Sequence, residues 1–168
     1  MKHVISVLVE NESGVLSRVA GLFSARGFNI ESLTVAPVGK GDVSHITLVT
    51  MGDNNIIEQI LKQLNKLIPV IQVANLTEGA HVARELMMVK VDAQREVRAE
   101  VLRIADIFRS RVVDATPTSF IVEVTGSSEK LNACLALLMP LGVTDVVRTG
   151  QVAMARGAGQ NHQFFKTP

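Results

Sequence analysis

The sequence predicts an α+β protein built from two tandem βαββαβ units. Three observations support this prediction. Short segments rich in β-branched residues alternate with segments of helical periodicity, in the order βαββαβ, up to residue 76. The same order then recurs with an offset of roughly eighty residues. Aromatic residues make up only 4% of the chain while hydrophobic residues make up 47%, so each core must pack from Val, Ile, Leu and Met.

Capping and breaking residues mark the elements of the first unit. Ser13 is expected to cap the first helix and Gly27 to stop it. Asp53 is expected to cap the second helix and Pro69 to end it. The expected strands are 3–10, 28–38, 43–51 and 70–76, and the apolar helix stripes are Val15, Leu16, Val19, Leu22, Phe23 and Ile56, Ile57, Ile60, Leu61, Leu64, Leu67, Ile68.

The second unit repeats this architecture with little residue identity. Ser127 is expected to cap its second helix, which Pro140 and Gly142 end. From Gly150 onward the chain shows no periodicity. We expect a first domain at 1–78, a second at 79–157 and a mobile tail at 158–168. The expected strands are 83–91, 111–117, 119–126 and 143–150, and the helix stripes are Val97, Val101, Ile104, Phe108 and Leu131, Cys134, Leu135, Leu138.

Two right-handed crossovers in each unit place both helices on one face of a four-stranded antiparallel sheet, which is the ferredoxin-like arrangement. The expected strand order is 4-1-3-2. The second strand of each unit is then an open edge, and an open edge invites pairing with another copy of the chain.

Charge and composition exclude several classes of function. Lys plus Arg is 17 and Asp plus Glu is 16, so there is no electrostatic reason to expect nucleic acid or an anionic membrane as a partner. An RNA-binding sheet also needs stacking aromatics on its first and third strands, and 3–10 and 43–51 contain none. The N-terminal apolar run is too short for a signal peptide or a membrane span. We therefore expect a cytoplasmic protein.

The sequence offers no catalytic or metal-binding constellation. None of the four histidines has metal-ligand spacing to another histidine or to the single cysteine. Asp42 and His45 are better interpreted as a polar turn and a strand position than as a dyad. Cys134 lies among leucines and is expected to be an inert core thiol. We expect no catalytic residues, no bound metal, and a binding or regulatory role.

The turn before the first helix is the strongest candidate for a binding site. The first N–H groups of a helix lack partners and favour an anion, and Gly14 lets a ligand approach the backbone. Asn11 adds a side chain that can donate or accept a hydrogen bond. With apolar surroundings, this turn would suit a free amino acid with a branched side chain. An ordinary capped turn explains the same spacing.

The chain also resembles a known family along nearly its whole length to Gly157. The resemblance is carried by SVLVENESGVLSRVAGLFSARGFNIESLTVAP, QLNKLIPVIQV, IFRSRVVDATP, TGSSEKLNA and VVRTGQVAMARG. These stretches are similar to the regulatory small subunit of acetohydroxyacid synthase, also called acetolactate synthase. The final QNHQFFKTP matches no motif of that family.

The resemblance implies a fold and a function. The first unit would be an ACT domain. The chain would carry no catalytic site and no cofactor. It would stimulate a separate catalytic large subunit, which carries thiamine diphosphate, magnesium and FAD. It would also confer feedback inhibition of that enzyme by valine. Such proteins act in branched-chain amino-acid biosynthesis. The remaining alternative is a free-standing amino-acid sensor acting on another partner, but no helix-turn-helix segment is visible.

The same resemblance implies a valine site shared between the two chains of a homodimer. One chain would supply the turn into its first helix, here called the helix mouth (residues 11–16). The second chain would supply residues at the start of its second strand. The second strands of the two chains would pair edge to edge across the two-fold axis. The implied effector-binding residues are Asn11, Gly14, Val15 and Leu16 of one chain, with Asn29 and Ile30 of the other.

Overall fold

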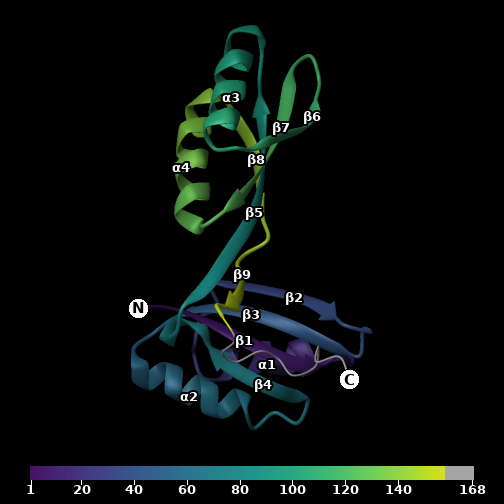
Figure 1. Ribbon diagram of the computed structural model, residues 1–168, viewed down its shortest axis with the longest axis vertical. Helices are drawn as coiled ribbons and strands as arrows, with labels where there is room; N and C mark the ends of the chain where they lie inside the picture. Colours follow the sequence, from purple (N-terminus) through teal and green to yellow (C-terminus); the bar gives the residue numbers. More distant parts are fainter. Residues whose placement is uncertain (158–168) are drawn as a thin grey trace. The chain divides into compact units, whose positions relative to one another are not determined.

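A computed structural model describes residues 1–157 of the chain. It divides into two compact units (Figure 1): residues 1–82 together with 151–157 form the first, and residues 83–150 form the second. The first unit therefore includes segments 79–82 and 151–157, which were expected in the second domain. The expected tail at 158–168 lies outside the described residues.

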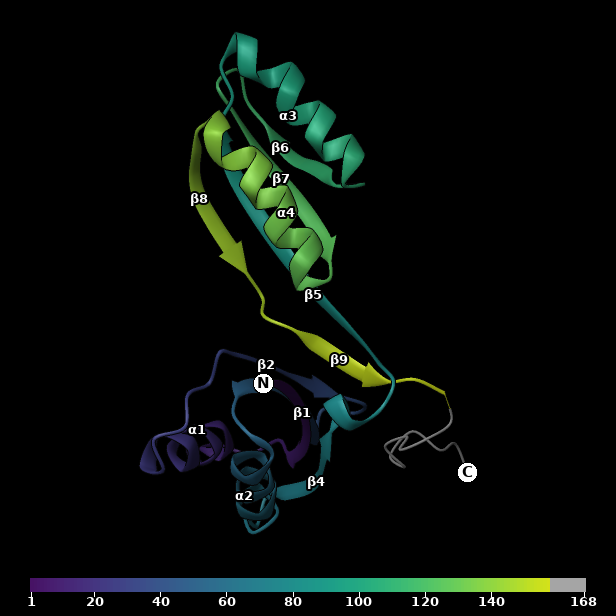
Figure 2. The same ribbon diagram turned by 90° about the vertical axis from the view of Figure 1, so that its left-hand side faces the viewer.

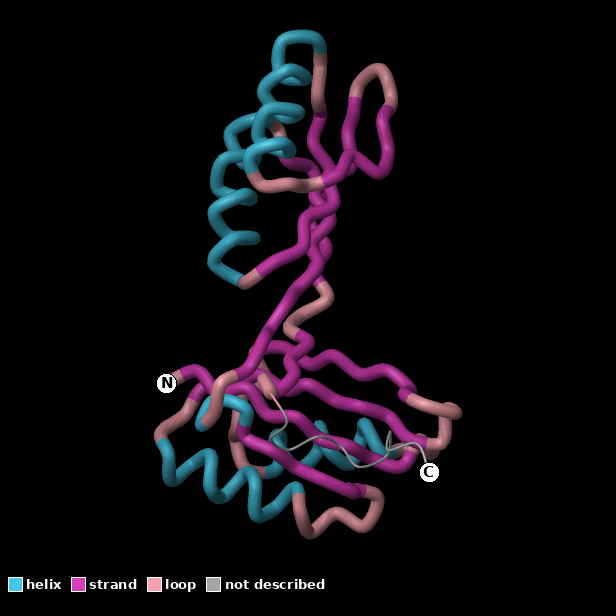
Figure 3. Tube along the Cα trace, viewed as in Figure 1, coloured by secondary structure: helices cyan, strands magenta, loops and turns pink. Residues whose placement is uncertain are grey.

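The first unit is a four-stranded antiparallel sheet in the order β2-β3-β1-β4, which confirms the expected order. Helices α1 and α2 cover one face of the sheet, as Figure 3 shows. Phe23 is the one aromatic ring among the fully buried described members of the core, and the partly buried ring of Phe28 packs against it. The elements are β1 (Lys2–Glu10), α1 (Val15–Ala25), β2 (Ser32–Val38), β3 (Val43–Met51), α2 (Asn54–Leu64) and β4 (Val70–Asn75).

The opposite face of this sheet carries a strand that the sequence analysis missed. Strand β9 (Val152–Ala155) lies against β1 on that face (Figure 2). The short 3-10 helix η1 (Leu76–Glu78), which follows β4, contacts both β1 and β9. The Val4 N–H donates to Thr77 Oγ1 at 2.8 Å, and the Arg156 N–H donates to the Ala80 carbonyl at 2.8 Å. Because β9 has four residues, two of them alanine, its alternation is too short to stand out in the sequence.

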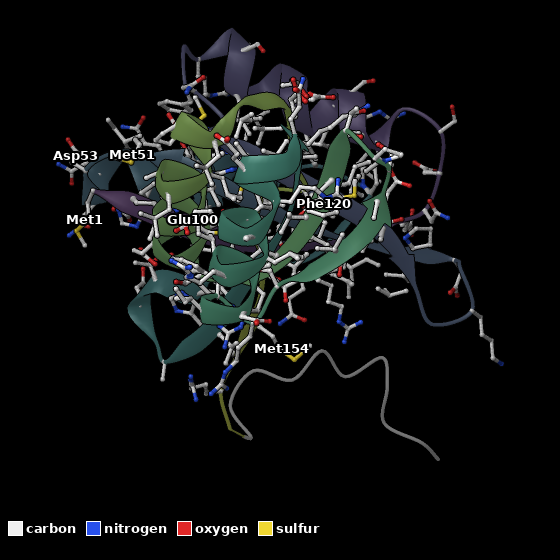
Figure 4. The ribbon with its side chains drawn as sticks, turned by 90° about the horizontal axis from the view of Figure 1, so that it is seen from above. Met1, Met51, Asp53, Glu100, Phe120 and Met154 are labelled. Atoms are coloured by element: carbon white, nitrogen blue, oxygen red, sulfur yellow. The ribbon has the colours of Figure 1, made fainter. Side chains whose placement is uncertain are left out.

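The second unit repeats the topology with the order β6-β7-β5-β8, all neighbours antiparallel. Its core is again aliphatic, with Phe120 as the one aromatic ring among its fully buried described members; Figure 4 labels this ring. The elements are β5 (His81–Asp92), α3 (Arg95–Ile107), β6 (Arg111–Ala115), β7 (Ser119–Gly126), α4 (Ser128–Leu138), η2 (Met139–Leu141) and β8 (Val143–Arg148).

Most of the expected caps are present. Asp53 accepts from the Ile56 N–H at 2.9 Å and Ser127 accepts from the Lys130 N–H at 3.3 Å. Gly27, just past α1, has φ +68°, the left-handed conformation that favours glycine after a helix. The expectation for Ser13 is wrong. The N-cap of α1 is Gly14, and no side chain among the described residues caps this helix.

Several expected element boundaries also differ from the structure, for example β6 ends at Ala115 and β8 at Arg148, and two boundaries of the first unit are wrong by four or five residues. Helix α2 ends at Leu64 rather than at Pro69, because the chain turns there: the Leu67 N–H donates to the Leu64 carbonyl and Ile68 is 94% exposed. Strand β2 begins at Ser32, so Asn29 and Ile30 precede it. An aromatic contact holds residue 28 out of the strand: its ring packs edge-on against Phe23 with centroids 6.4 Å apart.

Cys134 is fully buried between Leu131 and Leu138 in the second core. Burial raises the pKa of its thiol, outweighing the lowering effects of Ser110 and Lys130. Since the thiolate is the reactive form, we expect the folded protein to resist a thiol reagent at about pH 8 and to react fully once denatured by guanidinium. Rapid modification of the native protein would show that this core opens.

Candidate functional site

The mouth of α1 is formed where the chain leaves the central strand β1 and turns into the helix. Gly14 occupies the N-cap position with φ +85° and ψ −6°, a left-handed conformation that costs glycine little. A Cβ atom placed on Gly14 meets nothing within 4 Å, so the space in front of the helix is open. With no side-chain cap among the described residues, the first-turn N–H groups and the positive end of the helix dipole are available to an anion.

Asn11 ties this mouth to the β2–β3 hairpin. Its Nδ2 donates to the Gly41 carbonyl at 2.7 Å, and its Oδ1 accepts from Ser44 Oγ at 3.0 Å. The backbone N–H of Asn11 donates to the Asp42 carbonyl at 2.9 Å. The side-chain amide keeps one N–H and one lone pair for a ligand. The sequence alone does not reveal these hairpin partners, because they lie about thirty residues further along the chain.

The next two residues have different roles. Val15 is 4% exposed and belongs to the core, so it offers the site its backbone N–H rather than its side chain. That N–H lies 3.5 Å from the Glu12 carbonyl, which is a long contact. Leu16 is 42% exposed and presents apolar surface beside the mouth. The arrangement therefore combines backbone donors with a small hydrophobic surface.

One ion pair borders the mouth. Arg18 and Glu12 form an ion pair at 3.5 Å, with both side chains about half exposed. Such a pair adds little stability, but the guanidinium offsets a carboxylate that would otherwise repel a bound anion.

Asn29 and Ile30 of the same chain lie far from this mouth. The Asn29 carbonyl accepts from Thr50 Oγ1 at 2.6 Å, and its side chain donates to Glu31 Oε1 at 2.7 Å. Thr50 pairs with His3 at the start of β1, whereas the α1 mouth follows the end of the same nine-residue strand. At about 3.3 Å per residue the two places are roughly 26 Å apart. One chain therefore brings Asn11, Gly14, Val15 and Leu16 together but leaves Asn29 and Ile30 outside.

Residues 1–157 were also compared with the features of metal sites and of membrane-spanning helices. Within that range, no three His, Cys, Asp or Glu side chains gather in a way that could hold a metal ion. The helices of this part of the chain are also all too short or too polar to cross a membrane.

The first unit has the βαββαβ topology of the ACT class of domains. A family model described as "AHAS small subunit-like ACT domain" matches residues 5–72, and one described as "Small subunit of acetolactate synthase" matches residues 84–157. The chain belongs to the family of acetolactate synthase small subunits.

Relatives and a solved structure agree with this membership. The chain is 52% identical to a probable acetolactate synthase small subunit of Archaeoglobus fulgidus, with 94% of this chain and 98% of the relative covered. It is 51% identical to the acetolactate synthase isozyme 3 small subunit of Salmonella typhimurium, covering 94% and 97%. The crystal structure of the Thermotoga maritima small subunit superimposes with a TM-score of 0.86 at 38% identity, covering 94% and 98%.

Proposed function

We propose that this chain stimulates a catalytic subunit of acetolactate synthase in the cytoplasm and makes that enzyme sensitive to inhibition by valine. The catalytic large subunit would carry thiamine diphosphate, magnesium and FAD, and this chain would carry no cofactor. The observation that carries the proposal is the open, uncapped helix mouth at Gly14 in a chain of the small-subunit family.

The chemistry of valine fits the groups at this mouth. Its carboxylate would accept hydrogen bonds from the first-turn N–H groups, an arrangement that the helix dipole favours. Its branched side chain would pack on the exposed Leu16. Its ammonium would need an oxygen acceptor, and Asn11 Oδ1 keeps one lone pair beyond the one used by Ser44.

A second copy of the chain would complete the site. Asn29 and Ile30 lie at the opposite end of the sheet within one chain, so they could reach the valine only from a neighbour. Strand β2 is an edge of the first sheet, and antiparallel pairing of two such edges would bring the start of one β2 toward the far end of the other. The proposed active form is therefore a homodimer.

A ligand held between two chains provides a means of regulation. Valine would favour the dimer arrangement in which both halves of the site meet. It would change the enzyme's activity only because it binds this arrangement more tightly than the other one. The catalytic subunit would then respond through contacts that differ between those arrangements.

We expect the purified chain alone to produce no acetolactate from pyruvate. Adding it to the separately purified catalytic subunit should raise the activity, and valine should then inhibit. The measurement is acetolactate formation by each protein and by the mixture, with a denatured sample of this chain as the control. Activity of the chain alone would contradict a regulatory role, and a mixture with neither stimulation nor valine response would favour a sensor that acts on another partner.

A further inference from the structure

A groove of about 500 Å³ lies in the first unit at the end of the sheet opposite the α1 mouth. The start of β1, the first turns of α2 and the end of β4 with η1 form its walls. Figure 4 labels Met1, Met51 and Asp53 at this end of the unit. Its lining includes Met1, His3, Ile57, Leu61, Thr77 and Glu78.

The floor of this groove contains a histidine whose hydrogen-bonding groups are unused. His3 is only 3% exposed, and neither Nδ1 nor Nε2 has a partner among the described residues. A neutral imidazole carries one donor and one acceptor. Leaving such buried groups unsatisfied is costly, and native proteins do so rarely. A ligand or a ligand-borne water that enters the groove would relieve this cost.

The groove also carries a carboxylate that forms no ion pair in the described part of the chain. The formal cation among the lining residues is the Met1 α-ammonium, which donates to the Gly52 carbonyl at 3.1 Å. Glu78 pairs with no Lys, Arg or His in the described part of the chain, and its Oε1 accepts only from Asn75 Nδ2, at 2.7 Å. Thr77 connects the wall at η1 to β1, because its hydroxyl accepts from the N–H of Val4 at 2.8 Å. The second carboxylate of the groove, Glu58, is already paired with Lys62 at 2.6 Å.

We propose that this groove binds a small ammonium-bearing molecule between His3 and Glu78. The ammonium would donate to the acceptor nitrogen of His3 and to the free carboxylate oxygen of Glu78. Its apolar body would lie on Ile57 and Leu61, which line the same groove from α2. Both His3 nitrogens are shielded from solvent, so the ligand would have to displace a neighbouring side chain of the groove to reach them. The groove lies at the end of the sheet that also carries Asn29, and it makes no use of the α1 mouth of the same chain.

Isobutylammonium chloride is a suitable probe, since it joins an ammonium group to a small branched body. We expect it to shift the amide resonances of His3, Thr77 and Glu78 saturably in the ¹⁵N-labelled full chain. Sodium isobutyrate, the anion of the same size, should leave these resonances unchanged. No shift with the amine, equal shifts with both compounds, or saturable shifts with zinc chloride alone would overturn the proposal.

Two variants connect the binding to the named groups. Glu78→Gln keeps the acceptor for Asn75 and removes only the charge, so we expect it to weaken isobutylammonium binding by about tenfold or more. The control Glu96→Gln removes an exposed carboxylate in the second unit and should change nothing. Unchanged binding in Glu78→Gln would overturn the role of this carboxylate and with it the proposal.

His3→Phe keeps the ring and removes both nitrogens. We expect this variant to lose the amine shifts and to melt roughly 2–4 °C higher than the wild type, because two unsatisfied buried polar atoms disappear. Loss of binding together with higher stability separates a ligand-binding histidine from a merely structural one. Full retention of amine binding in a folded His3→Phe protein would contradict the proposal.

Discussion

Replacing Gly14 with Asp is expected to weaken valine inhibition of the reconstituted enzyme by about tenfold or more. Position 14 is the N-cap of α1, and an Asp side chain at an N-cap accepts from the first-turn N–H groups. The new carboxylate would occupy the donors proposed for the valine carboxylate and would repel that anion. A tenfold loss of affinity corresponds to about 1.4 kcal/mol. Losing helix-end interactions of about 0.3–2 kcal/mol and adding repulsion between the two carboxylates can account for it.

The fold should survive this substitution. The added Cβ meets open space, and the left-handed φ of +85° costs a non-glycine residue about 1–2 kcal/mol, less for Asp and Asn. Gly14→Asn is the matched control, because it has the same shape and backbone cost without the charge, and it should weaken valine less. The measurement is a valine titration with stimulation recorded in the same preparation. Lost stimulation with unchanged valine sensitivity would mean that this turn contacts the catalytic subunit instead.

Val35→Pro should break the pairing of two β2 edges and raise the dimer dissociation constant roughly tenfold to a hundredfold. Pro37 has no N–H, so its backbone nitrogen cannot donate to β3. Along a strand, successive N–H groups point to opposite sides. The N–H of Val35, two residues before Pro37, therefore also points away from β3. Val35 lies on this open edge and is 39% exposed. Proline at 35 removes that outward donor from each copy, and two hydrogen bonds are worth about 1–3 kcal/mol together.

Sedimentation at micromolar concentration tests this prediction. The wild type should sediment at about twice the 18.1 kDa monomer mass or more, and Val35→Pro should shift toward the monomer and lose valine inhibition in parallel. Val35→Thr retains the N–H and the β-branched shape and should behave as the wild type. A monomeric variant that stays fully sensitive to valine would contradict a site shared between chains.

Much of the fold followed from the sequence because its segments agree with one another at several levels. Short β-branched segments, one-sided helices and the caps Asp53 and Ser127 all indicate the same βαββαβ order, and the structure has it twice. The errors arose where long-range packing overrides local signals. Residue 28 looks like part of a strand but packs on Phe23, and Ile68 continues the helical stripe but is exposed in a turn.

The candidate site was predictable in part. The mouth at Gly14 has a local signature, and its geometry is as open as that signature indicates. The hydrogen bonds from Asn11 to the hairpin depend on β2 and β3 lying beside the end of β1, and no local pattern encodes such a contact. The groove at His3 is hidden for the same reason, since its walls come from residues more than fifty positions apart in the chain.

Strand β9 has a consequence for the order in which the protein is made. The first unit contains residues from both sides of the second unit in the chain, so during synthesis it waits for its last strand until the second unit has left the ribosome. Domains generally fold as units, and N-terminal domains fold first during synthesis. In this chain the first unit can start to fold before the second unit is made, but it cannot complete its fold until β9 has been made. Until residues 152–155 emerge, the part of β1 that faces β9 stays uncovered in the nascent chain.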